Sequence, residues 1–190
     1  MPKPRKMLGA ADSPYIVSLM RLIETQSKAT IAAWCIGYAE AQILPIYAKT
    51  FPHDRRPFHA LQAARDWMDG KVKLPEVKRI ILQECHAAAR EAEDYPAAQA
   101  AARTCGQAAA CIHTPTHSLG LAFYGSAAIA YDRVGTNEPS GVYDRIAAEE
   151  CANGRRPAAD RGGKRAPPRQ NQLALLKIHI SVSDKRRRAP

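Results

Sequence analysis

The spacing of apolar residues predicts a helical chain from about residue 13 to residue 152. Apolar side chains recur three or four positions apart, which is the repeat of one face of an α-helix. Strand-like alternation is nearly absent before residue 173. Helices are expected at approximately 14–26, 27–47, 57–70, 75–94, 96–112, 115–134 and 140–151. The pattern predicts an all-α protein, an antiparallel bundle of about six to seven helices.

Prolines mark where these helices begin and bend. Ser13 and Thr114 each precede a proline, a combination typical of an N-cap followed by the first helical residue. Pro45 should kink or split the helix over 27–47, because proline lacks an amide hydrogen and crowds the carbonyl four residues earlier.

Small side chains dominate the middle of the chain, where 16 of residues 87–130 are alanine. One stripe at helical spacing consists of Val77, Ile81, Cys85, Ala88 and Ala92, and a second of Ala98, Ala101, Cys105, Ala108 and Ile112. The second stripe should let a neighbouring helix approach closely. Residues 119–131 are apolar nearly all round, which predicts the central helix of the bundle.

Charge divides the chain into a nearly neutral body and basic ends. The whole chain has 28 Lys+Arg and 18 Asp+Glu, a net charge of +10. Residues 1–150 hold 17 basic and 16 acidic residues, whereas residues 151–190 hold 11 and 2. We therefore expect a flexible basic N-terminus over 1–12, one domain over 13–152, and a disordered basic tail over 153–190. Nucleic-acid binding is expected only through this tail, and a polyanion-binding adaptor working through 155–188 remains a hypothesis.

The sequence also favours a cytoplasmic protein. It has no run of 18 apolar residues for a membrane span, and its first residues lack the apolar stretch of a secretion signal. Five cysteines without a CxxC pair suggest reduced thiols.

Three histidines are the candidates for chemistry. His113 and His117 are four residues apart, and His86 lies in a neighbouring predicted helix, so the three could hold a metal ion. Pro115 makes a regular helix between the first two unfavourable, and no HExxH, phosphate-loop or nucleophile motif accompanies them. Packed structural histidines are the favoured interpretation. No catalytic residue or cofactor is predicted, and a small metal-dependent helical enzyme remains the alternative.

Several stretches resemble a known family. The most specific are ECHAAAREAE (84–93) and HTPTHSLGLAFYGSAAIAYD (113–132), and the similarity extends in order over about residues 19–151. They resemble the immunity-five-like family of bacterial immunity proteins, which is found beside polymorphic toxins. The resemblance implies a small cytoplasmic protein that binds a toxin domain and blocks it. It carries over no functional residues.

A neutralising protein needs a complementary surface more than a reactive group. Two polar segments are candidates for such a surface: the loop around residues 53–56 and the acidic edge around residues 91–94. The candidate contact residues are His53, Arg55, Arg56, Glu91, Glu93 and Asp94.

Overall fold

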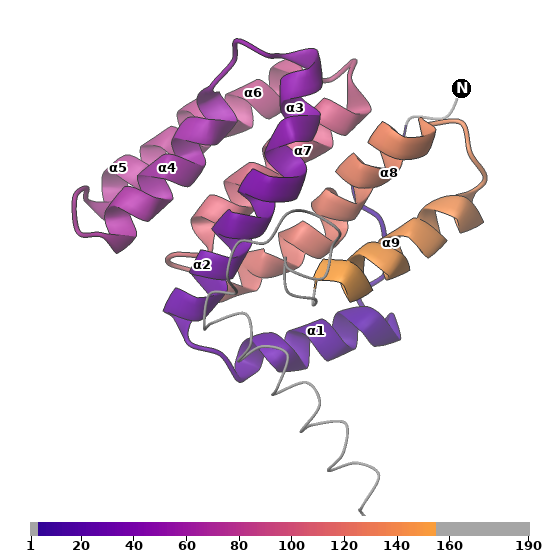
Figure 1. Cartoon of the computed structure of the whole chain (residues 1–190), viewed down its shortest axis with the longest axis horizontal. Helices are drawn as coiled ribbons and strands as arrows, with labels where there is room; N and C mark the ends of the chain where they lie inside the picture. The colour runs from indigo at the N-terminus through magenta and orange to yellow at the C-terminus, as the bar shows by residue number, and fades with distance from the viewer. Residues whose placement is uncertain (1–3, 155–190) are drawn as a thin grey trace, which may run out of the picture.

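The computed structural model describes residues 4–154, and this part of the chain is helical without strands (Figure 1). The α-helices are α1 (Pro14–Glu24), α2 (Lys28–Tyr38), α3 (Leu44–Thr50), α4 (Arg56–Met68), α5 (Leu74–Ile80), α6 (His86–Glu91), α7 (Pro96–Ala110), α8 (Ser126–Val134) and α9 (Ser140–Gly154). None of the described helices is long and apolar enough to cross a bilayer. From residue 155 on, the predicted basic tail lies outside the described residues.

Single π-helical turns join several of these helices into longer rods. One turn (Ala39–Ile43) joins α2 to α3, and another (Ile81–Cys85) joins α5 to α6. A third (Leu121–Gly125) leads into α8. Counted this way, the described chain forms seven helical rods, and the predicted all-α architecture is confirmed.

The first π turn ends at Ile43, two residues before Pro45, where the sequence predicts a kink or a split. The Leu44 N–H donates to the Ala39 carbonyl, five residues earlier instead of four. Widening the helix here accommodates a proline that cannot donate a hydrogen bond. The regular α-helical hydrogen bonding is therefore interrupted before Pro45, while α2 and α3 remain joined in one rod. The helix predicted over 75–94 is present as one rod, in which a π turn joins α5 to α6, and it ends at Glu91.

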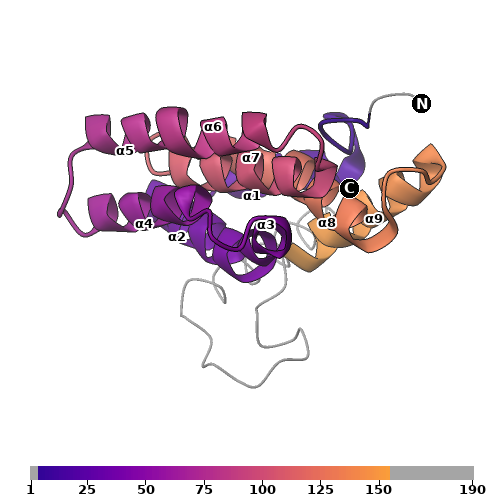
Figure 2. The same cartoon turned by 90° about the horizontal axis from the view of Figure 1, so that it is seen from above.

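Helix α7 occupies the centre of the described bundle. Figure 2 shows α5 and α6 on one side of it and α2, α3 and α4 on the other, and α7 also contacts α8. Its alanine stripe is buried, as predicted. The prediction that residues 119–131 form the central helix is wrong. Alanine side chains let neighbours approach α7 from several directions, whereas the bulkier segment before α8 packs on one side of it.

At two of the predicted helix starts, the expected N-cap side chain does not cap the helix. Ser13 precedes α1, but its hydroxyl accepts from the Ala10 N–H at 3.3 Å and does not cap the helix. Thr114 precedes a 3₁₀ turn, Pro115–Ser118, instead of a regular α-helix, and its side chain makes no capping bond.

The segment before α1 is attached to the last two helices. Leu8 is fully buried, and its N–H donates to the Phe123 carbonyl at 3.1 Å. The Tyr131 hydroxyl donates to the Arg5 carbonyl at 2.6 Å, and the Arg5 guanidinium pairs with Asp144 at 3.1 Å. These contacts belong to a segment for which the sequence predicts flexibility. That flexibility and the domain limits 13–152 stay predictions.

Candidate functional site

The loop between α3 and α4 is organised around the carboxylate of Asp54. Its Oδ2 accepts a hydrogen bond from the Tyr47 hydroxyl at 2.6 Å. Its Oδ1 accepts one from the Arg56 backbone N–H at 3.0 Å, and the Arg56 Nη2 lies 2.7 Å from Oδ2. Because Tyr47 is buried in the core, these bonds fix the polar loop to the body of the protein.

The same arginine joins the two segments that the sequence analysis selected. The Arg56 guanidinium donates to Glu91 with both terminal nitrogens, Nη1 to Oε1 at 3.0 Å and Nη2 to Oε2 at 2.5 Å. A two-pronged pair of this kind fixes orientation as well as distance. It ties the first turn of α4 to the last turn of α6. The fold thus brings the loop at 53–56 and the edge at 91–94 to one end of the bundle.

The network also fixes the charges of its members. Burial opposes ionisation of Asp54, but the hydrogen bonds from Arg56 and Tyr47 outweigh it and lower the pKa of this carboxyl from 3.8 to about 2. Burial, and then the hydrogen bond to Asp54, raises the pKa of Tyr47. The hydrogen bonds to Glu91 and Asp54 raise the pKa of Arg56. Near neutral pH, Asp54 is an anion, Arg56 a cation and Tyr47 a neutral donor.

Aromatic side chains also lie at this end of the bundle, and they are not among the candidate residues predicted from the sequence. Phe51 packs edge-on against Tyr95, with ring centroids 5.3 Å apart, and the Arg55 guanidinium lies 4.4 Å from the centre of the Phe58 ring. Tyr95 is 52% exposed, high for so large a side chain. The signal that could have found it is its position in a loop, between Asp94 and a proline.

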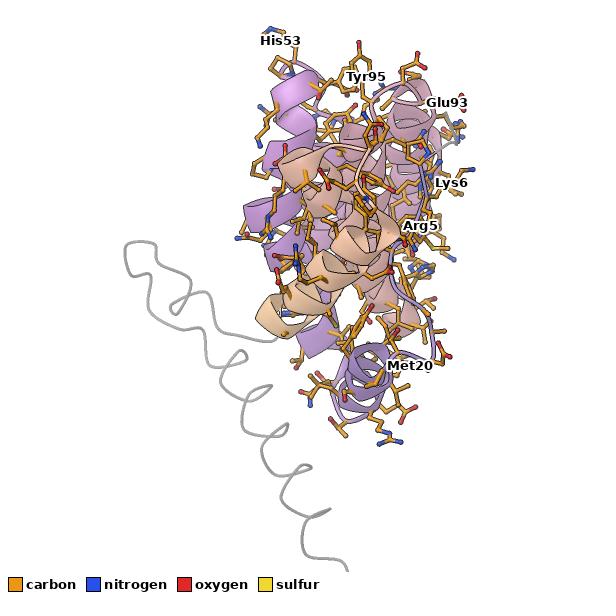
Figure 3. The ribbon with its side chains drawn as sticks, turned by 90° about the vertical axis from the view of Figure 1, so that its right-hand side faces the viewer. Arg5, Lys6, Met20, His53, Glu93 and Tyr95 are labelled. Carbon is orange, nitrogen blue, oxygen red and sulfur yellow. The ribbon has the colours of Figure 1, made fainter. Side chains whose placement is uncertain are left out.

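The remaining selected residues lie around this network. His53, Arg55, Glu93 and Asp94 are exposed. Figure 3 shows His53, Tyr95 and Glu93 at the same end of the molecule, with Met20 at the opposite end. We call the surface formed by Phe51, His53, Arg55, Arg56, Glu91 and Tyr95 the end surface.

The three histidines lie elsewhere, along the side of α7. The rings of His113 and His117 are 5.9 Å apart between centroids, and the His117 Nδ1 lies 2.6 Å from the Gln107 Oε1. Burial lowers the pKa of all three imidazoles, and a weaker effect of His117 reaches both His86 and His113. Within residues 4–154, no group of three or more His, Cys, Asp or Glu side chains is arranged to hold a metal ion.

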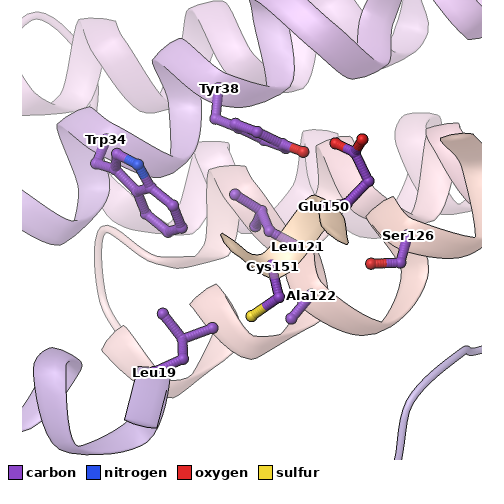
Figure 4. A pocket seen from close by; sticks show the side chains of 8 residues that line it. All are labelled: Leu19, Trp34, Tyr38, Leu121, Ala122, Ser126, Glu150 and Cys151. Carbon is purple, nitrogen blue, oxygen red and sulfur yellow. The ribbon is translucent and has the colours of Figure 1, made fainter. Parts of the chain in front are cut away.

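A small hollow lies between α1, α2, α8 and α9 (Figure 4). It is lined by Leu19, Trp34, Tyr38, Leu121, Ala122, Ser126, Glu150 and Cys151. The buried Glu150 carboxylate is paired with Arg133 at 2.6 Å. A cavity of about 20 Å³ holds roughly one water molecule, so this hollow is too small for a substrate.

Fold and surface together define a small all-α protein whose candidate contact residues lie at one end of its surface. The family comparison agrees, since residues 21–154 match the family described as Imm-5 like putative immunity protein. The chain belongs to this family. No curated protein and no solved structure matched it.

Proposed function

We propose that this protein binds a bacterial toxin domain in the cytoplasm and neutralises it. The observation that carries the proposal is family membership over residues 21–154, which includes almost the whole described bundle. A function of this kind requires surface complementarity, and it requires no metal or reactive side chain.

The end surface is the contact region that we propose. It combines a rigid arginine–carboxylate network with the exposed ring of Tyr95 and the half-buried ring of Phe51. Binding energy in protein interfaces is concentrated on aromatic and arginine anchors. Tyr95 is the leading anchor, because half of it is exposed and Phe51 supports its ring. Since the network is already ordered, binding loses less side-chain entropy there.

The alternative of a metal-dependent enzyme using His86, His113 and His117 gains no support from the described residues, since they contain no metal-holding group. The adaptor hypothesis for residues 155–188 concerns a segment outside the described part of the chain.

The test is coexpression with the toxin domain encoded beside this gene, followed by measurement of growth and of binding. Tyr95→Ser and Met20→Ser form a matched pair, because both side chains are exposed (52% and 40%) and they lie at opposite ends (Figure 3). Tyr95→Ser should weaken binding roughly 30-fold, the loss of an anchor of about 2 kcal/mol, and Met20→Ser by less than about twofold.

Two outcomes would count against the proposal in different ways. If the wild-type protein neither binds nor protects, the function is wrong. If it protects but the two variants behave alike, the function stands and the end surface is not the contact.

A further inference from the structure

A second polar surface runs along α6 and α7 and is not part of the end surface. It consists of His86 and Arg90 on α6, Arg103 and Gln107 on α7, and His113 and His117 after α7. We call these six residues the histidine face. Except for Arg90, which is exposed, their side chains are half-buried, so they combine fixed positions with access from solvent.

Two glycines allow this face to form. A Cβ at Gly106 would lie 2.9 Å from the His86 Cε1, and a Cβ at Gly120 would lie 2.6 Å from the Gln107 Cγ. Both distances are too short for real contacts. The backbone therefore leaves room for His86 and for Gln107, and Gln107 in turn holds His117 through the 2.6 Å contact at Nδ1.

The charges that act on the histidine face have one sign. After burial, Arg90 and Arg103 lower the pKa of His86, and Lys78 lowers the pKa of His113; no carboxylate contributes. Within residues 4–154, none of these three cations has a carboxylate partner within 4.0 Å.

The nearest acidic residues on the same rod are already engaged. Glu84 pairs with Arg79 at 3.3 Å, and Glu91 pairs with Arg56. Within the described chain, the guanidinium groups of the histidine face therefore have no carboxylate within ion-pair distance, although Glu93 lines the same hollow as Arg103. In addition, the His113 Nδ1 is buried without a hydrogen-bond partner.

We propose that the histidine face binds an acidic segment of a protein partner, with aspartate or glutamate side chains seated between the arginines and the imidazoles. The inference rests on the proposed function to the extent that the toxin domain is the protein that carries this segment. A protein carboxylate fits better than a nucleic acid, because the described body is nearly neutral overall, whereas a phosphate chain needs many cations along its path.

The test uses the full chain and a decaglutamate peptide, with NMR signals of the histidine side chains as the readout. The salt concentration is about 0.15 M, at which distant exposed charges are screened. The peptide should then shift the NMR signals of His86, His113 and His117 and leave those of His53 and His59 unchanged. Because the readout is specific to these rings, binding of the peptide to the basic tail does not imitate the result.

Two charge-matched variants locate the binding. Arg90→Gln/Arg103→Gln removes two cations from the histidine face, and Arg21→Gln/Lys28→Gln removes two exposed cations from α1 and α2. The first should weaken the peptide-induced histidine shifts about fivefold in apparent affinity, and the second less than about twofold.

The proposal is overturned if the peptide leaves the three imidazole signals unmoved or if both double variants lose affinity equally. It is also overturned if a single-stranded RNA decamer shifts the same signals at lower concentration, because the favoured ligand would then be a phosphate chain. If the protein binds the peptide but not the toxin domain, the proposed function is wrong, but the inference that the histidine face binds acidic segments is retained.

Discussion

The end surface and the histidine face use the same kinds of residue in opposite ways. At the end surface, Arg56 is enclosed by two carboxylates, Asp54 and Glu91. On the histidine face, Arg90 and Arg103 have no carboxylate within ion-pair distance in the described chain. The charge of Arg56 is used within the protein, where it orders the loop. The charges of Arg90 and Arg103 remain available to bind a partner.

Composition alone therefore does not show whether a cluster of charged residues stabilises the fold or binds a partner. A paired arginine stabilises the loop that presents its neighbours, so the binding energy of the end surface should come from Tyr95 and not from the ions. An unpaired arginine adds little to stability and can add to recognition. The following substitutions separate these roles.

The largest effect is expected from Arg56→Gln. The substitution leaves Asp54 partly buried without its main cationic partner and removes the ion pair between α4 and Glu91, so the free energy of unfolding should fall by about 2–3 kcal/mol. Urea denaturation followed by circular dichroism measures it. A loss below about 0.5 kcal/mol would mean that the network is not structural.

Asp54→Asn should cost about 1–2 kcal/mol near neutral pH, since a carboxyl with its pKa lowered to about 2 stabilises the fold by favouring the ionised form. The sign follows from proton binding: the unfolded chain, with the higher pKa of 3.8, takes up protons first as the pH falls. This contribution is complete above about pH 4 and is lost as the pH falls towards about 2. Denaturation curves of both proteins should therefore converge in acid; a constant difference would contradict this.

Gly106→Ala changes the histidine face without changing its charge. The added methyl group should push the His86 ring towards solvent, and the pKa of His86 should rise because burial is what mainly lowers it. The helix gains intrinsic stability from alanine, about 1 kcal/mol, so the net change in unfolding free energy should stay within about 1 kcal/mol. NMR titration of His86 provides the measurement, with Gly37→Ala, where a Cβ meets nothing, as the control. An unchanged His86 pKa would show that the ring does not depend on Gly106.

The smallest effect is expected from Arg103→Gln. With no carboxylate partner to lose, its unfolding free energy should match the wild type within about 0.5 kcal/mol. The same denaturation assay as for Arg56→Gln gives the direct contrast. If both arginines cost the same, the distinction between the two surfaces fails.

Part of the candidate site could be predicted from local sequence. The polar character of residues 53–56 and 91–94 is visible in the chain, and both segments lie at helix ends. The contact between Arg56 and Glu91, 35 positions apart, could not be predicted, because it depends on how α4 packs against the rod that α5 and α6 form. Tyr95 and Phe51 were missed for the same reason: an edge-on pair forms only when two loops meet.

The three histidines also show that spacing in the sequence does not fix the geometry of a site. Their spacing permitted a metal site, yet the distances and directions that a metal requires are set by the packing of α6, α7 and the 3₁₀ turn, and the described residues do not provide them.

The all-α class, the buried stripes and the interruption before Pro45 could all be predicted from the chain, because each depends on side-chain spacing or on backbone chemistry within a few residues. Tertiary structure alone decided that α7 is central, that Arg56 is neutralised and that Arg90 and Arg103 are not. Those outcomes depend on which surfaces meet, and alanine-rich helices can approach one another in several ways with similar local energies.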